Sequence, residues 1–182
     1  MTKFSAILSD PPWSFKVWSN KGKDRSAENH YPVMTLQQIK DLDVPSVCKP
    51  DCCLFLWVTN PMLKQGIDVL ESWGMTYKTV AFTWVKTNKT KLGFSMGLGY
   101  WSRANAEMCL LGTIGHPKRK QKNVHSLIVS QRREHSRKPE EVYGRIERLV
   151  DGPYLEMFAR HRRNGWACWG NEVTGDLRLE DV

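Results

Sequence analysis

The sequence predicts an α/β fold, a sheet with helices on both faces. Short apolar or β-branched runs alternate along the chain with segments of helical periodicity, and this alternation is typical of strands joined by helices. The chain has 182 residues and a hydrophobic content of 41%, which is enough for one packed core. We therefore expect a single domain over residues 1–175, followed by a polar tail at 176–182.

The first part of the chain contains two predicted strands and one helix. The apolar run Phe4–Leu8 predicts a short strand, which a pair of prolines ends. Thr35 is followed three residues later by Gln38, a capping-box spacing that predicts the start of a helix. Cys52–Val58 is continuously apolar, which is typical of a strand buried on both faces. The polar stretch 14–33 is expected to be a long mobile loop.

The same alternation continues to the C-terminus. A helix is predicted over 61–73, with Asn60 and Pro61 at its start and Gly74 at its end. A second helix is predicted over 139–150, where Ser136 and Pro139 open the segment. A glycine-containing stretch at 86–104 is expected to form a second flexible loop. Further strands are predicted over 76–85, 106–111, 126–130, 154–158 and 166–169.

Positive charge is concentrated in one segment. The formal net charge is +8, and residues 116–138 carry +7 of it. A basic cluster attracts polyanions and indicates nucleic acid as the partner, with a solvated loop pair as the alternative. The segment contains one acid, Glu134, and eight basic residues: Lys118, Arg119, Lys120, Lys122, Arg132, Arg133, Arg137 and Lys138.

The cysteine pattern favours a reducing compartment. Five cysteines is an odd number, and no CxxC pair occurs, so we expect reduced, largely buried thiols and no metal. A zinc site that uses Cys48 and Cys52 with a distant ligand is the alternative. No apolar run reaches the roughly 18–20 residues that span a bilayer, and the N-terminus does not resemble a secretory signal. We therefore expect a cytoplasmic protein without a membrane partner.

The turn Asp10-Pro11-Pro12-Trp13 follows directly on the first predicted strand. In an open α/β sheet the ligand site lies beyond the carboxyl ends of the strands, and residues 160–165 fall at another such end. Two prolines remove two N–H groups, so the turn presents a carboxylate and carbonyls as acceptors. Such a turn suits a ligand with two N–H donors, and an ordinary strand-ending turn is the alternative.

An exocyclic amine such as adenine N6 is a ligand of this kind. Asp10 and the carbonyl of Pro11 can each accept one of its protons, and Trp13 can stack on an extruded base. The lone pair of N6 is delocalised into the purine ring, so the amine is a poor nucleophile. Two accepted hydrogen bonds localise that lone pair toward an incoming methyl group. Transfer from a sulfonium then depends mainly on positioning and electrostatics.

The same four residues resemble the DPPW motif of the MT-A family of N6-adenine methyltransferases. The segments AFTWVKTNK, GYWSRANAEMCLLGTIG, SRKPEEVYGRIERL and YLEMFARHRRNGWACWGNE are similar to that family and occur in its order. The resemblance covers about residues 4–173. It implies a class I, Rossmann-like methyltransferase domain with permuted motif order, and S-adenosyl-L-methionine as the methyl donor.

The resemblance also implies roles for individual residues. It assigns the DPPW motif to catalysis, with Asp10 also close to the donor, and it places Tyr31 over the target base, where a core tyrosine is the alternative. Glu107 resembles a family glutamate near the site. Glu156 belongs to the segment that cradles the donor, or is a strand-end charge paired with an arginine. The donor-binding residues that the resemblance implies, besides Asp10, are Lys138, Phe158, Arg160, Asn171 and Glu172. Arg162 departs from the family pattern and is expected to bind the donor's carboxylate, with a contact to phosphate as the alternative.

The expected function is methyl transfer to adenine N6 in DNA, as in short bacterial or phage-like members. The alternatives are an RNA methyltransferase and a non-catalytic nucleic-acid-binding subunit, and the basic segment disfavours a small-molecule enzyme. Monomer and homodimer both remain open. Trp18 and Trp101 are candidates for base stacking, for an interface or for the core. Besides Tyr31, the expected substrate-binding residues are Lys118, Arg119, Lys120, Arg132 and Arg133.

Overall fold

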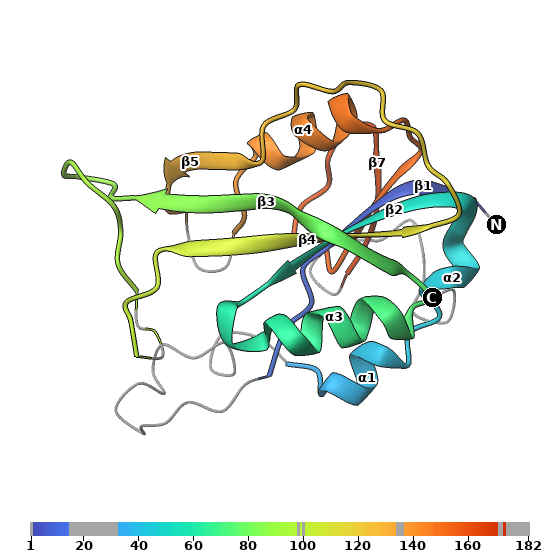
Figure 1. Cartoon of the computed structure of the whole chain (residues 1–182), viewed down its shortest axis with the longest axis horizontal. Coiled ribbons are helices and arrows are strands. Elements are labelled where there is room, and N and C mark those ends of the chain that lie inside the picture. Colours follow the sequence, from blue (N-terminus) through green and yellow to red (C-terminus); the bar gives the residue numbers. More distant parts are fainter. Residues whose placement is uncertain are drawn as a thin grey trace.

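The computed structural model describes residues 2–14, 33–97, 99, 101–133, 137–170 and 173. Seven strands form one sheet in the order β5-β3-β4-β2-β1-β6-β7 (Figure 1). The strands are β1 (Phe4–Ser9), β2 (Cys48–Val58), β3 (Thr76–Thr87), β4 (Ala106–Ile114), β5 (Leu127–Gln131), β6 (Tyr154–Met157) and β7 (Trp166–Trp169). The helices are α1 (Leu36–Lys40), α2 (Val44–Val47), the 3-10 turn η3 (Asn60–Met62), α3 (Leu63–Ser72) and α4 (Glu141–Leu149).

Strand direction decides which ends of the strands meet. β4 is antiparallel to both of its neighbours, β2 and β3, whereas all other paired strands are parallel. The carboxyl ends of six strands therefore lie at one edge of the sheet, which we call the carboxyl edge. The start of β4 lies at the same edge, and its end lies at the opposite, amino edge.

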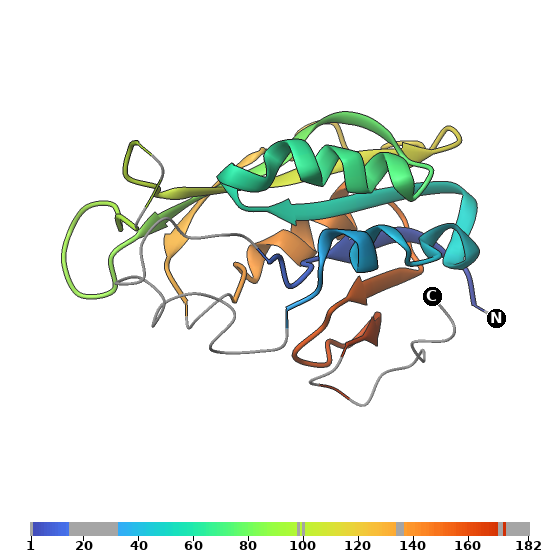
Figure 2. The same ribbon diagram turned by 90° about the horizontal axis from the view of Figure 1, so that it is seen from below.

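Helices cover both faces of the sheet, as the sequence predicts. One apolar cluster joins one sheet face to Ile39 of α1, Val47 of α2 and Leu70 of α3, and α1 and α3 lie side by side (Figures 1 and 2). The other cluster joins the opposite face to Val142 and Ile146 of α4. The predicted α/β architecture, with helices on both faces of the sheet, is therefore confirmed.

The central strand β2 shows why the sheet is buried on both sides. Leu54, Leu56 and Val58 point into the first cluster, while Phe55 and Trp57 point into the second. All five are at most 2% exposed. The prediction that this apolar run is a strand buried on both faces is confirmed.

Most element boundaries agree with the sequence patterns, with a few additions. The capping box of Thr35 and Gln38 is present at the start of α1. The helix α2 was not predicted, and β2 begins at Cys48, four residues before the predicted start at Cys52. The register of β2 against β1 is irregular near the start of β2. The strand β3 runs to Thr87, into the segment predicted as a loop.

All five cysteines are buried and unbridged. Within the described residues no group of three or more His, Cys, Asp and Glu side chains could hold a metal ion. No helix in the part of the chain that the structure describes is long and apolar enough to cross a membrane. The predicted mobile loop 14–33 lies almost wholly outside the described residues, and so do Ser136 and the tail at 176–182. The single domain over 1–175 remains a prediction.

Candidate active site

The carboxyl ends of β1 and β6 are neighbours, because the two strands pair in parallel with Ser9 opposite Met157. Asp10 follows the first strand and Phe158 follows the second. A cavity of about 230 Å³ opens at this point. Besides Asp10 and Phe158, its lining includes Trp57, Lys138, Tyr143, Glu156, Arg160 and Arg162. The fold therefore converts two strand ends, far apart in the sequence, into one cavity.

Backbone hydrogen bonds hold the turn after β1. The N–H of Trp13 donates to the carbonyl of Pro11 at 2.8 Å, and the N–H of Met34 donates to the carbonyl of Pro12 at 3.1 Å. A carbonyl oxygen has two lone pairs, so the oxygen of Pro11 can accept one further donor. The turn thus keeps the acceptor character that the sequence predicts.

The role predicted for the Trp13 ring is wrong. The side chain is only 5% exposed, and its Nε1 donates to the carbonyl of Trp57 at 3.0 Å. A ring packed into the core with its N–H bonded inside has no free face for a base. Trp13 instead anchors the turn, so that Asp10 is held at the mouth of the cavity.

A chain of alternating charges converges on Asp10. Lys138 Nζ donates to Asp10 Oδ2 at 2.7 Å and lies 3.4 Å from Glu107 Oε2. Glu107 also accepts a hydrogen bond from Lys86, at the end of β3. These side chains are between 15% and 27% exposed. Charges this poorly hydrated are tolerated because each has an opposite partner.

The two carboxylates in this chain have opposite pKa shifts. Burial raises the pKa of Asp10 above its usual value, although the ammonium group of Lys138 acts in the other direction. Burial would also raise the pKa of Glu107, but the ammonium groups of Lys138 and Lys86 outweigh it and lower that pKa. Glu107 therefore stays ionised, while Asp10 binds a proton more readily than an ordinary aspartate.

Aromatic rings and the Glu156 carboxylate form another part of the cavity wall. Lys138 Nζ lies 5.7 Å from the centre of the Trp57 ring, within cation–π range. The hydroxyl of Tyr143 donates to Glu156 Oε1 at 2.8 Å, and the Arg163 guanidinium lies 4.5 Å from the centre of the Tyr143 ring. Burial raises the pKa of Glu156 to about 7, against the lowering effect of the Tyr143 hydrogen bond.

The segment after β6 has an unusual backbone at the cavity. Phe158 has a φ of 61°, which places a non-glycine residue in the left-handed region. Such strain persists where the surrounding structure enforces it, and it often marks a ligand site. The Phe158 ring packs edge-on against Trp169, with ring centres 4.9 Å apart. Arg160 and Arg162 follow and bring positive charge to the same wall.

The structure brings five of the predicted donor-binding residues together, since Asp10, Lys138, Phe158, Arg160 and Arg162 all line the cavity. Tyr31, Asn171, Glu172 and Trp18 lie outside the described residues. Trp101 is fully exposed in the connection between β3 and β4. Arg132 and Arg133 line a second cavity, of about 560 Å³, which shares Arg137 and Glu140 with the first.

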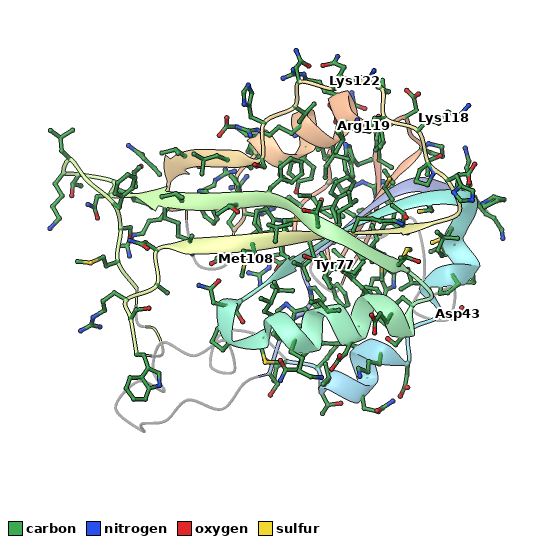
Figure 3. All side chains as sticks on the ribbon, viewed as in Figure 1. Asp43, Tyr77, Met108, Lys118, Arg119 and Lys122 are labelled. Atoms are coloured by element: carbon green, nitrogen blue, oxygen red, sulfur yellow. The ribbon has the colours of Figure 1, made fainter. Side chains whose placement is uncertain are left out.

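The basic segment is divided between the two edges of the sheet, so its cations do not all lie beside Asp10. Lys118, Arg119 and Lys120 lie on the loop from β4 to β5, and that loop joins the end of an antiparallel strand to the start of β5 at the amino edge (Figure 3). Lys120 is tied there to Asp151, with Nζ 2.9 Å from Oδ1. Only the part after β5 reaches the carboxyl edge.

Sequence reasoning missed Lys86, Trp57 and Tyr143 as site residues. Lys86 belongs to AFTWVKTNK, a segment used only to support the family resemblance. Its meeting with Glu107 depends on the pairing of β3 with β4, where Trp84 lies opposite Glu107. That register joins residues about twenty positions apart, and no local pattern specifies it.

The residues present fit a donor of the S-adenosylmethionine type. Such a donor carries a carboxylate, an ammonium group and a flat adenine ring. Arg160, Arg162 and Lys138 supply positive charge for the carboxylate, and Asp10 supplies negative charge for the ammonium group. The Phe158 ring provides an apolar surface at the same wall.

A mostly parallel α/β sheet with an acceptor turn and a cationic cavity at its carboxyl edge is the arrangement expected of a class I methyltransferase. Residues 4–172 match the family described as MT-A70, and the chain belongs to that family. It is 35% identical to the type II methyltransferase M.MunI of a Mycoplasma species, over 98% of this chain and 81% of that protein.

Longer eukaryotic relatives match as well. The chain is 36% identical to the N(6)-adenosine-methyltransferase MT-A70-like protein of Arabidopsis thaliana, over 94% of this chain and 24% of that protein. It is 34% identical to the human N(6)-adenosine-methyltransferase catalytic subunit METTL3, over 95% of this chain and 29% of that protein. The chain therefore spans about a quarter of the length of these relatives.

Glu156→Gln is expected to change how stability depends on pH. The pKa of Glu156 in the fold is about 7, against an ordinary value of 4.5, so the native state binds its proton more tightly than the unfolded chain does. The stability of the wild type should then fall as the pH rises from about 4.5 to about 7. Glutamine can keep the Tyr143 hydrogen bond and has no proton to lose. The advantage of the variant should therefore grow across this range.

Thermal unfolding of both proteins between pH 4 and pH 8 measures the effect. The control is Glu141→Gln, which removes a carboxylate on an exposed surface of α4. Parallel Tm curves for the wild type and Glu156→Gln would contradict the raised pKa.

Proposed function

We propose that this chain transfers a methyl group from S-adenosyl-L-methionine to N6 of adenine in DNA. The observation that supports this most strongly is the turn after β1. It presents the Asp10 carboxylate, 27% exposed, at a cavity mouth, and Pro11 and Pro12 remove two backbone N–H groups beside it. A site that offers acceptors and few donors suits an amine that has two protons to donate.

Two acceptors on this turn would orient the target amine. Lys138 donates to Oδ2 of Asp10, so we assign Oδ1 to one N6 proton and the carbonyl of Pro11 to the other. Both hydrogen bonds localise the N6 lone pair along one direction. The Trp13 anchor and the Lys138 ion pair keep the carboxylate in place, which lowers the reorganisation needed during the reaction.

The site also contains a group that can accept the proton that N6 must lose. When the C–N bond forms, N6 gains a positive charge and becomes a strong acid. Asp10 accepts one of its hydrogen bonds, and burial raises its pKa. Asp10 is therefore the group placed to take the proton and pass it to solvent. Glu107, whose pKa is lowered, stays ionised and holds Lys138 in position.

The donor is proposed to lie between the ends of β1 and β6. When bound, it supplies a methyl group on a positively charged sulfur. Phe158 and Arg160 form one wall of its cavity, and Lys138 and Arg162 bring positive charge for its carboxylate. The proposed roles of Asn171 and Glu172 on its ribose rest on the family resemblance. We further propose one catalytic domain over 1–175, acting in the cytoplasm as a monomer or homodimer.

DNA is proposed as the substrate because of the relatives' lengths. The type II methyltransferase M.MunI is matched over 81% of its length, whereas the relatives named as N(6)-adenosine-methyltransferases are matched over less than a third. The match thus extends over most of a type II methyltransferase but over only one part of the longer relatives, and this supports DNA. RNA is the second candidate, favoured by the names of the longer relatives.

Asp10→Asn is expected to lower the methylation rate by roughly 10²–10³-fold, the usual effect of removing one preorganised polar contact to a reacting group. The amide removes the charge and the proton-accepting capacity of this side chain. The assay follows transfer from labelled S-adenosyl-L-methionine to adenine-containing DNA and RNA, each single- and double-stranded. The control is Asp151→Asn, the same change at an 80% exposed side chain on the amino edge.

Equal rates for Asp10→Asn and Asp151→Asn would contradict the catalytic assignment. Faster transfer to RNA than to DNA would support the second candidate. Tight nucleic-acid binding with no transfer to any substrate would instead indicate a non-catalytic binding subunit.

Neutralising cations at the two edges should have unequal effects on DNA binding. Arg132→Gln/Arg133→Gln removes two charges from the carboxyl edge, beside the proposed site, and Lys118→Gln/Arg119→Gln removes two from the amino edge. Only the first pair is expected to weaken binding strongly and to reduce the slope of log K against log salt, by about 0.9 for each phosphate that the variant no longer neutralises. Fluorescence anisotropy over a salt series measures both quantities. Equal effects of the two pairs would show that net charge alone matters.

A further inference from the structure

Three arginine side chains converge on one carboxylate beside the active site. Arg133 Nη1 lies 2.7 Å and Arg137 Nη2 lies 3.0 Å from Glu140 Oε1. Arg163 Nη1 lies 3.3 Å from the other oxygen, Oε2. Glu140 immediately precedes α4 and lines both the smaller and the larger cavity. The reaction proposed above does not use this cluster.

The larger cavity keeps an excess of positive charge even with Glu140 in place. Its cationic side chains are Lys89, Arg132, Arg133 and Arg137, and its acids are Glu140 and Glu141. Glu141 is 3.7 Å from Arg145 on the next turn of α4. Among the described residues, Lys89 and Arg132 make no salt bridge. Among the four cations that line this cavity, Glu140 contacts only Arg133 and Arg137.

We propose that Glu140 occupies the position of a backbone phosphate, and that the phosphodiester next to the target adenine displaces it from Arg133 and Arg137. This inference rests on the proposed function, because it concerns the strand whose adenine enters the Asp10 cavity. The two cavities share Arg137 and Glu140. A nucleotide with its base at the Asp10 mouth of the smaller cavity, next to the donor, can therefore place its phosphate at this cluster.

The exchange is physically reasonable because both anions suit a guanidinium group. Carboxylate and phosphate each accept two parallel N–H bonds from arginine. The Glu140 side chain is 50% exposed, and exposed ion pairs contribute little to stability, so displacing it costs little. Burial alone would raise the pKa of Glu140, but the hydrogen bonds from Arg133 and Arg137 outweigh it and lower the pKa. The carboxylate therefore competes with phosphate at neutral pH.

Glu140 thus weakens binding to nucleic acid in general. A strand that touches only the protein surface must compete with a carboxylate already in position. A strand that also inserts an adenine forms additional interactions in the smaller cavity and overcomes this competition. The carboxylate can also return when the product leaves, which shortens the lifetime of the product complex.

Glu140→Gln in the full-length chain tests this exchange, with Glu141→Gln as the matched control. Both variants remove one carboxylate from the lining of the larger cavity, but only Glu140 contacts the cluster arginines. Glu140→Gln should bind an adenine-containing DNA oligonucleotide about threefold to tenfold more tightly than Glu141→Gln, with a steeper salt dependence. Glu140→Asp keeps the charge on a shorter side chain and should fall between them. Fluorescence anisotropy at several salt concentrations gives both quantities.

Two further measurements separate this exchange from other roles of Glu140. Adding Arg133→Gln to Glu140→Gln should abolish most of the increase in DNA affinity. Calorimetric affinity for S-adenosyl-L-methionine should differ less than twofold between Glu140→Gln and Glu141→Gln. Higher donor affinity in place of higher DNA affinity would overturn the inference, because Glu140 would then compete with the donor's carboxylate.

Equal DNA affinity in Glu140→Gln and Glu141→Gln would also overturn the inference. Weaker binding by Glu140→Gln would overturn it too, since this is the result if Glu140 only aligns the arginines. The methylation assay is read separately. If no nucleic acid is methylated but Glu140→Gln binds DNA more tightly, the proposed function fails, and Glu140 competes with phosphate in DNA binding alone. If DNA is methylated and the two variants bind alike, the exchange fails alone.

Discussion

The ion pair between Lys138 and Asp10 is the interaction on which the site depends. It joins the segment before α4 to the end of β1, 128 positions earlier in the chain. The Lys138 side chain is 15% exposed and that of Asp10 is 27% exposed. Removing one partner would leave a poorly hydrated charge without compensation, which is strongly unfavourable. The pair therefore stabilises the cavity and fixes the orientation of the acceptor carboxylate at the same time.

The reversed direction of β4 explains both the composition of the site and the division of the basic segment. Because β4 is antiparallel, its first residues lie beside the last residues of β3, and Glu107 meets Lys86 and Lys138 at the carboxyl edge. The same reversal carries the end of β4 to the amino edge. The following loop, with Lys118 and Arg119, therefore starts there. The antiparallel direction of β4 thus places Glu107 at the site and places Lys118 and Arg119 at the opposite edge.

Much of the fold follows from local patterns in the sequence. The apolar run of β2, the capping box of α1 and the proline turn after β1 each have a direct physical signature, and each is present. The gathering of Asp10 and Phe158 follows from the general rule for parallel strand ends. Strand direction and register are different, since they depend on pairings between distant segments. For that reason the position of Lys118 and the contacts of Lys86 could not be predicted.

The burial of Trp13 was unpredictable for a similar reason. Its neighbour Trp57 lies 44 positions away on another strand, so no local pattern shows that the ring faces the core.

A site composed of a carboxylate, a carbonyl and few N–H donors should select an exocyclic amine over every other group on a base. The most direct measurement is therefore mass spectrometry of nucleosides from DNA methylated by the purified chain. N6-methyladenine is the expected product. Methylation at a ring carbon would contradict the selection of an exocyclic amine, and methylation at the cytosine amine would contradict adenine as the target.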